Sequence, residues 1–355
     1  MATHQHPTAI PAGSLILITG ITSYVASFTA QSLLERGYRV KGVVRNLAQD
    51  SAWLTEELFP SFAGPDGTFD LVEIPDLTIP GAFDAVFGES RPSAVIHTAT
   101  PMTFDPDPNK VITPVVDIMS SLLRAAASMS SIKRFVYTSS IGAAYSPQVG
   151  VPAVLTRDSW NEDAVEAAWA PPPYTPARGG KVYAASKVEA ERAMFRFAED
   201  TKPGFAVISV DPFFILGAVL HRRHLQGSGV GYATSTTGSR EFRECCLLVR
   251  CQVNVQDVAA LHVAAVLDPD VQSGDRLLAA AEPFNVNVVL AILRRQHPDR
   301  QFMEDLPSSQ GLCLASIGNE DNDRLLGLLR KWTGREGWIS LEQGVREAIR
   351  SMEGL

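Results

Sequence analysis

Short apolar runs alternate with longer segments of helical periodicity over the first two-thirds of the chain. The short runs have the length and flanking residues of buried strands, whereas apolar residues in the longer segments recur at about every third or fourth position. Alternation of strands and helices is typical of a parallel sheet. We therefore expect strands at 14–19, 39–44, 69–73, 93–97, 133–138 and 205–210, and helices at 23–36, 109–130 and 181–200.

This order of elements predicts an α/β fold: a Rossmann-type doubly wound parallel sheet with a smaller C-terminal mixed α/β substrate domain. Residues 1–13 are expected to form a polar N-terminal tail. The dinucleotide-binding domain would comprise 14–217 and 251–268, and the substrate domain with its flap would comprise 218–250 and 269–355.

Two stretches depart from the alternation. Residues 146–180 contain two tryptophans and three successive prolines, which indicates a long ordered loop beside the site. Residues 218–250 are rich in Gly, Ser and Thr, which is typical of a flexible flap. In the last part of the chain, Asn285 and Ser340 have the residue type and position of helix N-caps.

Composition limits the classes of partner. The net charge of −8 argues against nucleic acid or an anionic membrane surface as the main partner. No apolar stretch approaches the length of a membrane span and the start has no signal-peptide pattern, so we expect a cytoplasmic protein. We predict no metal site, because the cysteines lack ligand spacing and are expected to be free thiols: Cys245, Cys246, Cys251 and Cys313.

The turn after the first predicted strand has the character of a phosphate-binding loop. Gly20 allows a tight turn, and Ala26 allows the following helix to pack closely on the strand. The N–H groups at the start of that helix would face a pyrophosphate. Ser23 stands where a middle glycine is usual, and its hydroxyl would bind a phosphate or simply cap the helix.

The ends of the second and third strands indicate which dinucleotide is bound. NAD-binding proteins usually carry an acidic residue after the second strand, but here the strand ends in Arg45. A guanidinium is a bidentate phosphate ligand, which favours NADPH/NADP⁺; the alternative is an ordinary solvated arginine. Asp76 and Leu77 follow the third strand, where a carboxylate can accept from the adenine amino group.

Tyr183 and Lys187 lie four residues apart in a predicted helix, so their side chains share one face. A free phenol has a pKa of roughly 10. A neighbouring ammonium favours the phenolate, and this brings the tyrosine toward use as a general acid for a carbonyl. The pair follows the serines 139–140 at the end of a strand, where a hydroxyl faces the ligand crevice. This order is more specific than the tyrosine-lysine spacing alone.

These stretches together resemble the extended short-chain dehydrogenases/reductases, in the branch of dihydroflavonol 4-reductase, cinnamoyl-CoA reductase and fungal aldehyde and ketone reductases. The matching segments occur in family order over roughly residues 14–282: 19–20, 43–45, 76–77, 95–101, 135–140, 183–187, 210–217 and 255–259. The chain departs from the family pattern at Ser23.

The resemblance implies a role for each matching residue. Ser140 would orient the substrate carbonyl, Tyr183 would donate the proton, and Lys187 would assist Tyr183 and hold the nicotinamide ribose. Ser140 is preferred to Ser139 because the catalytic serine of the family is the last of its run. The expected cofactor contacts are Gly20, Thr22, Ser23, Tyr24, Val25, Arg45, Asp76, Leu77, Thr98, Ala99, Thr100, Tyr183, Lys187, Pro212 and Phe213.

The favoured function is NADPH-dependent reduction of a ketone or aldehyde. Aromatic residues near the expected pocket suit an apolar or aromatic substrate, although some of them are core residues: Tyr145, Trp169, Tyr174, Phe213 and Phe214. Similarity to the fungal reductases suggests a polyketide or another secondary metabolite.

Two alternatives remain open at this point. One is a nucleotide-sugar epimerase or dehydratase, which would need basic residues for a diphosphate. The run 221–224 could supply them, but an exposed charged loop is the simpler interpretation. The other is a regulator that senses a dinucleotide without turnover. Helices 109–130 and 181–200 could also form the contact of a homodimer.

Overall fold

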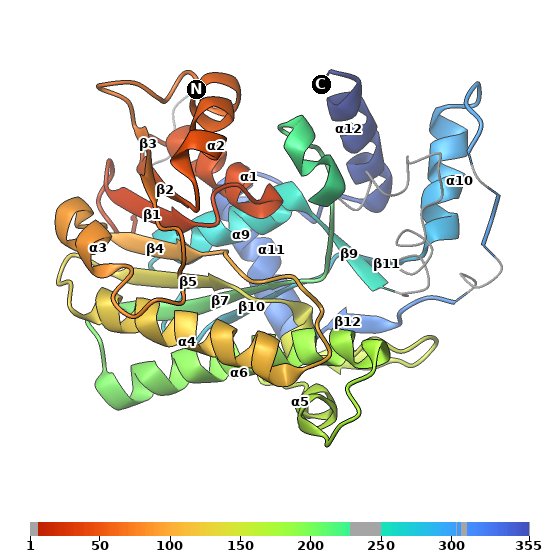
Figure 1. Cartoon of the computed structure of the whole chain (residues 1–355). Helices are drawn as coiled ribbons and strands as arrows, with labels where there is room; N and C mark the ends of the chain where they lie inside the picture. Colours follow the sequence, from red (N-terminus) through yellow and green to blue (C-terminus); the bar gives the residue numbers. More distant parts are fainter. Residues whose placement is uncertain (1–5, 228–249, 303, 307–310, 355) are drawn as a thin grey trace.

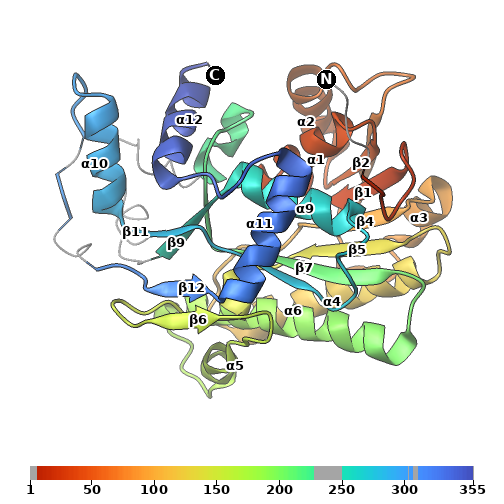
Figure 2. The same ribbon diagram turned by 180° about the vertical axis from the view of Figure 1, so that it is seen from behind.

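The centre of the molecule is a parallel sheet of seven strands in the order β10-β7-β5-β4-β1-β2-β3 (Figures 1 and 2). The computed structural model describes residues 6–227, 250–302, 304–306 and 311–354. The expected strands all form, with ends that move by at most a few residues. The order confirms the doubly wound Rossmann fold. The strands are β1 (Leu15–Thr19), β2 (Arg39–Val44), β3 (Phe69–Glu73), β4 (Ala94–His97), β5 (Arg134–Thr138), β7 (Ala206–Pro212) and β10 (Arg276–Ala279).

Alternate residues of the strands face two different cores. In β1, Ile16 and Ile18 pack with helices on one face of the sheet, and Leu17 packs with helices on the other. The first face is covered by α1 (Tyr24–Leu34), α9 (Val255–Leu267) and α11 (Asn319–Thr333). The second face is covered by α3 (Asp84–Ser90), α4 (Pro108–Ala127) and α6 (Gly179–Thr201) (Figures 1 and 2).

Smaller elements gather beyond the carboxyl ends of the strands. A second sheet of β8 (Phe214–Leu216), β9 (Arg250–Asn254) and β11 (Glu282–Phe284) packs with α10 (Val286–Gln296) and α12 (Leu341–Glu353). The expected N-caps of α10 and α12 are confirmed. Asn285 accepts a hydrogen bond from the backbone N–H of Val288, and Ser340 accepts one from that of Gln343.

The stretch 146–180 is ordered and has secondary structure of its own. It contains β6 (Ala153–Leu155), α5 (Glu162–Trp169) and the short helix η3 (Pro176–Arg178). β6 pairs with β12 (Ala315–Ile317), and α5 packs against α6. This stretch is therefore attached both to the C-terminal part of the chain and to the helix that carries Tyr183.

The topology departs from the expected domain limits. β10 belongs to the large sheet, and α11 packs on its face, although both fall in the range 269–355 that we expected to form the substrate domain. The N-terminal segment is also less tail-like than its composition indicates. Ile10 is fully buried, and the N–H of Ala9 donates to the Leu267 carbonyl at 2.8 Å.

The expectation of a flexible flap at 218–250 can be compared with the structure only in part. Residues 228–249, including Cys245 and Cys246, lie outside the described residues. Cys251 and Cys313 are buried free thiols. Among the described residues, no helix has the length and apolar character needed to cross a membrane, and no cluster of three metal-ligating side chains occurs.

Candidate active site

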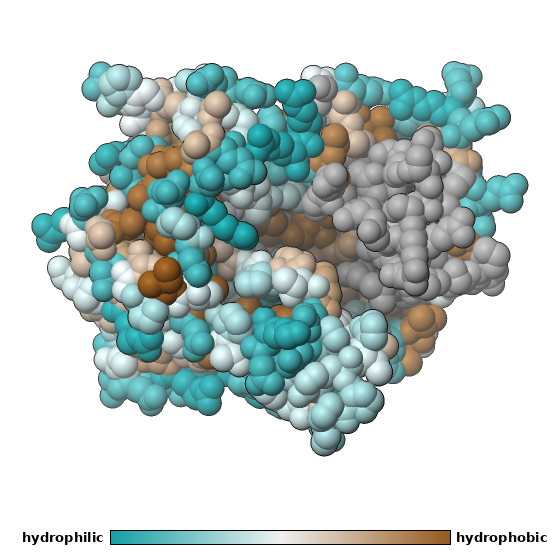
Figure 3. All heavy atoms as spheres, viewed as in Figure 1, coloured by the Kyte–Doolittle hydropathy of each residue, from teal (hydrophilic) through white to brown (hydrophobic). Residues whose placement is uncertain are grey.

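The strand order reverses between β1 and β4, and the chain leaves these neighbours in opposite directions. In doubly wound sheets, ligands bind in the crevice outside the carboxyl ends of the strands at this point. Figure 3 shows a recess floored by hydrophobic residues on this side of the molecule, where the strand arrows of Figure 1 end. Most of the residues expected from the sequence to form the site lie along this edge.

Gly20 makes the turn between β1 and α1. Its φ of +68° lies in the left-handed region, and a β-carbon there would be 2.8 Å from Thr98 Oγ1 and 3.0 Å from the backbone of Ala99. Only glycine therefore lets this turn close against the end of β4. The result is a tight backbone cradle at a helix N-terminus, which fits the pyrophosphate of a dinucleotide.

Ser23 is the N-cap of α1. Its hydroxyl accepts from the N–H of Ala26 at 3.3 Å and lies 3.4 Å from Thr98 Oγ1. Of the two roles expected for Ser23, the structure shows the helix cap. Next to it, Thr22 is half-buried, whereas the side chains of Tyr24 and Val25 are buried. Since the Tyr24 hydroxyl donates to the Ala218 carbonyl at 2.7 Å, Tyr24 can offer a phosphate only its backbone.

The residues expected near the adenosine lie at the ends of β2 and β3. Arg45 follows β2 and is exposed. The Asp76 carboxylate accepts from both the N–H and the hydroxyl of Thr78, at 2.8 and 2.7 Å, and these bonds lower its pKa. Leu77 is half-buried and packs on the core beneath α3. The structure thus shows Asp76 shaping its own turn.

The end of β4 is fastened to β1 by hydrogen bonds. His97 Nδ1 lies 2.7 Å from Thr19 Oγ1, and the Thr98 hydroxyl donates to the Thr19 carbonyl at 2.6 Å. Burial lowers the pKa of His97 to about 3, helped by the charge of Lys187, so its imidazole is neutral. Thr98, Ala99 and Thr100 are half-buried, as expected of residues that line a cofactor groove.

Lys187 lies buried at the centre of this edge. Its ammonium donates to the Thr100 hydroxyl at 2.9 Å, the Thr138 carbonyl at 3.0 Å and the Tyr137 hydroxyl at 3.2 Å. These three acceptors match the three protons of an ammonium. Burial lowers the pKa of Lys187 to about 7, while the charges of Glu191 and Asp211 act in the opposite direction. The group can therefore change its protonation state near neutral pH.

Tyr183 lies one turn before Lys187 on α6 and is half-buried. The Lys187 ammonium is 5.9 Å from the centre of the Tyr183 ring. On the other side, the Phe104 ring packs against Tyr183 with 5.2 Å between the ring centres. Phe104 was not predicted as a site residue. It has a φ of +49°, an unusual backbone conformation for a residue with a side chain, and such strain concentrates at functional sites.

The two serines after β5 differ in their surroundings. The Ser139 side chain is buried and its hydroxyl donates to the Glu191 carboxylate. Ser140 is half-buried and accepts from the N–H of Gly142 at 3.2 Å, which leaves its hydroxyl proton available for a ligand oxygen. Ser140 is followed by the short helix η2 (Ile141–Ala143), which packs on α6 beside Ala184. Ser140 and Tyr183 therefore both lie at the N-terminal end of α6.

The expected aromatic residues do not form one continuous wall. Pro212 ends β7, and Phe213 packs in the main core. Phe214 packs on Phe284 in the smaller domain. Trp169 and Tyr174 are the more exposed members of the set. Tyr145 is half-buried, and its hydroxyl accepts from the N–H of Gln148.

The run 221–224 is not simply an exposed loop. His221 and His224 are buried, and only the two arginines between them are exposed. The His221 ring stacks on Trp53 at 4.9 Å, and His224 Nε2 lies 3.2 Å from the carbonyl oxygen of Thr22. The segment therefore packs against the nucleotide turn through contacts between residues distant in sequence.

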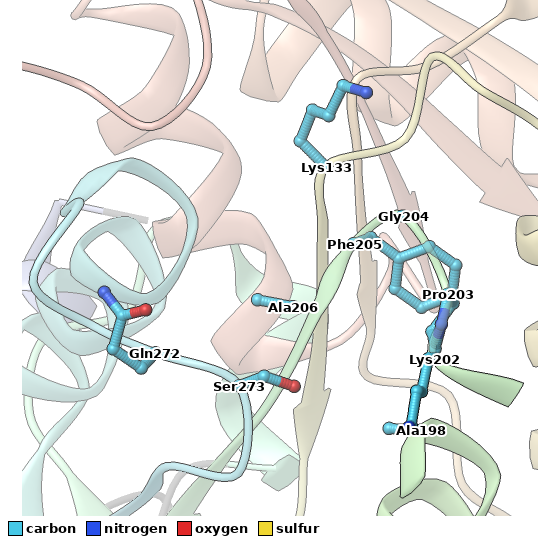
Figure 4. A pocket seen from close by; sticks show the side chains of 9 residues that line it. All are labelled: Lys133, Ala198, Lys202, Pro203, Gly204, Phe205, Ala206, Gln272 and Ser273. Atoms are coloured by element: carbon cyan, nitrogen blue, oxygen red, sulfur yellow. The ribbon is translucent and has the colours of Figure 1, made fainter. Parts of the chain in front are cut away.

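A depression of about 310 Å³ lies elsewhere, at the amino ends of β5 and β7 (Figure 4). It is lined in part by Lys133, Lys202 and Phe205. Because ligands of doubly wound sheets bind at the carboxyl ends, this depression is separate from the site described above.

Comparison with known proteins agrees with this geometry. A model of the NAD dependent epimerase/dehydratase family matches residues 16–280. The chain is 37% identical over 344 residues to the NAD-dependent epimerase/dehydratase terH of Aspergillus terreus. This match covers 96% of this chain and 98% of terH. It is 32% identical to aldehyde reductase 2 of Sporidiobolus salmonicolor, with 96% and 97% covered.

Among solved structures, yeast methylglyoxal/isovaleraldehyde reductase Gre2 complexed with NADPH matches with a TM-score of 0.75 at 22% identity. The match covers 96% of this chain and 99% of the Gre2 chain, and it supports the fold. The resemblance expected from the motifs is confirmed at the level of the family. The chain belongs to the NAD-dependent epimerase/dehydratase family.

Proposed function

We propose that this protein is an NADPH-dependent reductase that converts a ketone or aldehyde of an apolar or aromatic small molecule into an alcohol. The observation that carries the proposal is the arrangement of Tyr183, Lys187 and Ser140 at one end of α6. All three adjoin the crevice that begins at the Gly20 turn. The relationship to aldehyde reductase 2 supports carbonyl reduction over nucleotide-sugar chemistry.

Each side chain has a distinct part in the reaction. The Ser140 hydroxyl donates to the carbonyl oxygen and stabilises the charge that develops there. Tyr183 gives its phenolic proton to the same oxygen. The Lys187 ammonium, 5.9 Å from the ring centre, favours the phenolate that remains. NADPH, when bound, supplies the hydride.

The cofactor preference follows from the end of β2. Arg45 is exposed there, and a guanidinium suits the 2′-phosphate that distinguishes NADPH from NADH. The Gly20 turn and the start of α1 would hold the pyrophosphate, and Thr98–Thr100 would line the groove toward Lys187. The yeast Gre2 structure that resembles this chain is a complex with NADPH, which agrees with this choice.

Phe104 is a further expected contact of the substrate. Its ring packs on Tyr183, so a planar apolar group could lie beside it when the carbonyl reaches the tyrosine. Similarity to fungal reductases agrees with a secondary metabolite, such as a polyketide, as the substrate.

The experiment is NADPH oxidation with a panel of aryl and alkyl ketones and aldehydes, comparing wild type with Tyr183→Phe. The variant keeps the ring that packs on Phe104 but has no acidic proton. We expect its kcat to fall by about 100-fold or more, with NADPH affinity retained.

Each other outcome identifies a different function. NAD that co-purifies with a protein unable to reduce carbonyls would favour an epimerase or dehydratase. NADPH binding with equal inactivity of wild type and Tyr183→Phe would favour a regulator that senses the dinucleotide.

A further inference from the structure

Three residues of α6 form a stripe along the end of β5. Tyr183, Lys187 and Glu191 are spaced four residues apart, so they lie on one face of the helix, one turn after another. Lys187 donates to the carbonyl of Thr138, and Glu191 accepts from the hydroxyl of Ser139. The helix therefore contacts successive residues of the chain that leads into Ser140.

Glu191 is completely buried and links several elements. Its carboxylate accepts from Arg276 Nε of β10 at 2.6 Å and from the Ser209 hydroxyl of β7 at 3.5 Å. Together with the bond from Ser139, which follows β5, these contacts join α6 to the chain of three neighbouring strands, β5, β7 and β10. A buried charge needs such partners, because its removal from water costs several kcal/mol (order of magnitude).

Arg276 extends the network to the stretch before α5. Its guanidinium donates to the carbonyls of Arg157 and Ser159, the first at 2.9 Å, and lies 3.9 Å from the centre of the Trp160 ring. The same cation thus contacts Glu191 on one side and the backbone of the 146–180 stretch on the other.

A second carboxyl group shares this cation. Asp211 is fully buried, and its Oδ2 lies 3.8 Å from Arg276 Nε. Burial, together with the charge of Glu191, raises the pKa of Asp211 well above its usual range. Of the two carboxyl groups, Glu191 is the closer to the guanidinium, at 2.6 Å from Arg276 Nε against 3.8 Å for Asp211.

Two of the titratable groups around Lys187, His97 and Tyr137, carry no charge. His97 of β4 is kept neutral by burial, and burial also raises the pKa of Tyr137 of β5 well above its usual value. The remaining neighbours are Tyr183 and Glu191 of α6, Asp211 of β7 and Arg276 of β10. Among these neighbours, Glu191 has the largest charge effect that opposes the lowering of the Lys187 pKa by burial.

We propose that Glu191 is a positioning residue of the active site: its charge keeps Lys187 in the ammonium form, and its bond to Ser139 fixes the backbone that presents Ser140. The inference rests on the proposed function in that Lys187 and Ser140 serve carbonyl reduction. A salt bridge that only stabilises the fold would not control the protonation of Lys187.

The first test follows Lys187 directly by NMR of the lysine side-chain carbons in the cofactor-free protein, with the signal assigned by Lys187→Arg. In Glu191→Gln we expect the titration midpoint of Lys187 to fall by about one pH unit or more, a tenfold loss of proton affinity. In Glu191→Asp, which keeps the charge, the midpoint should stay near the wild-type value. A wild-type midpoint in Glu191→Gln would overturn the proposal.

Two control variants separate charge from stability. The charge of Asp211 acts on Lys187 in the same direction as that of Glu191 but less strongly, so Asp211→Asn should lower the Lys187 midpoint by less than Glu191→Gln does. Asp257→Asn removes another buried carboxylate, which pairs with Arg335 and accepts from the N–H of Ile339. It should lower stability without changing the Lys187 titration. If Asp257→Asn shifts the midpoint as much as Glu191→Gln does, the effect is not specific and the proposal fails.

A loss of folding in Glu191→Gln would still leave a decisive variant. Arg276→Gln removes the cation that offsets Glu191, so the Lys187 midpoint should rise. An unchanged or lower midpoint in this variant would contradict the proposal.

The pH profile of kcat/KM for reduction is the second readout. Glu191→Gln should move the basic limb to lower pH, whereas a purely structural defect would reduce kcat equally at all pH values. The NMR titration needs neither cofactor nor substrate. It therefore decides the role of Glu191 even if no carbonyl compound is reduced and the proposed function fails.

Discussion

Ser139 and Ser140 are adjacent, but their hydroxyl groups have different surroundings. We expect Ser140→Ala to lower kcat by about 100-fold, because a donor to the reacting oxygen is lost, with little change in the free energy of unfolding. Ser139→Ala should lower that free energy by about 1–3 kcal/mol, because it removes a buried donor from Glu191. It should lower kcat less than Ser140→Ala does, because the Ser140 hydroxyl is kept. Steady-state kinetics and urea unfolding of the two variants measure this contrast. Equal kinetic losses without a stability difference would contradict the assignment.

The sequence gives part of this picture at the scale of single residues. The order of the serine pair, Tyr183 and Lys187 along the chain, together with the resemblance to the reductase family, predicts the three candidate catalytic residues. The burial of Glu191 was not predictable, because a helical glutamate is usually solvated and its partner Arg276 is 85 residues away. The positive φ of Phe104 depends in the same way on the fold around it.

At the scale of elements, the first turn of α6 contacts the loop that follows β4. A β-carbon on Gly179 would lie 2.2 Å from the Phe104 carbonyl oxygen, whereas one on Gly180 would have no atom within 4 Å. We expect Gly179→Ala to displace Phe104 from Tyr183, lowering kcat/KM and reducing stability by about 1–3 kcal/mol. Kinetics and thermal unfolding provide the measurement.

Gly180→Ala is the matched control for this contact. It adds the same methyl group one residue later in the same helix, where there is space. It should keep wild-type activity and be neutral or slightly stabilising. Equal activity in the two variants would show that the contact between the loop and α6 does not position the tyrosine.

The elements themselves were predictable because apolar periodicity is a local property. The expected helix at 181–200 and strand at 39–44 correspond closely to α6 and β2. The place of β10 in the large sheet, and of α11 on its face, was not predictable. Neither apolar periodicity nor spacing along the chain indicates which sheet a strand near the C-terminus joins. Pairing of β10 with β7 depends on tertiary contacts alone.

At the scale of the whole molecule, buried histidines make stability depend on pH. Burial lowers the pKa of His97 to about 3 and of His224 and His262 to about 4. The unfolded chain binds these protons near pH 6.5 and the folded protein does not, so stability is lost as pH falls below that value. Between pH 6.5 and 5 we expect the free energy of unfolding to fall by about 4–6 kcal/mol.

Urea unfolding at several pH values measures this dependence. In His262→Gln the slope should be smaller, because one of the three imidazoles whose pKa is lowered by burial is gone. A slope unaffected by His262→Gln would assign the acid sensitivity to other groups.

The contacts of Arg276 determine which substitutions the stretch 146–180 can accept without losing its attachment to the sheet. Arg276 holds the stretch before α5 through main-chain carbonyls, which every amino acid supplies. Side chains in 146–180 can therefore be replaced while the attachment to the sheet is preserved. We therefore expect that replacing this stretch with that of a relative changes substrate specificity while its attachment to the sheet is kept.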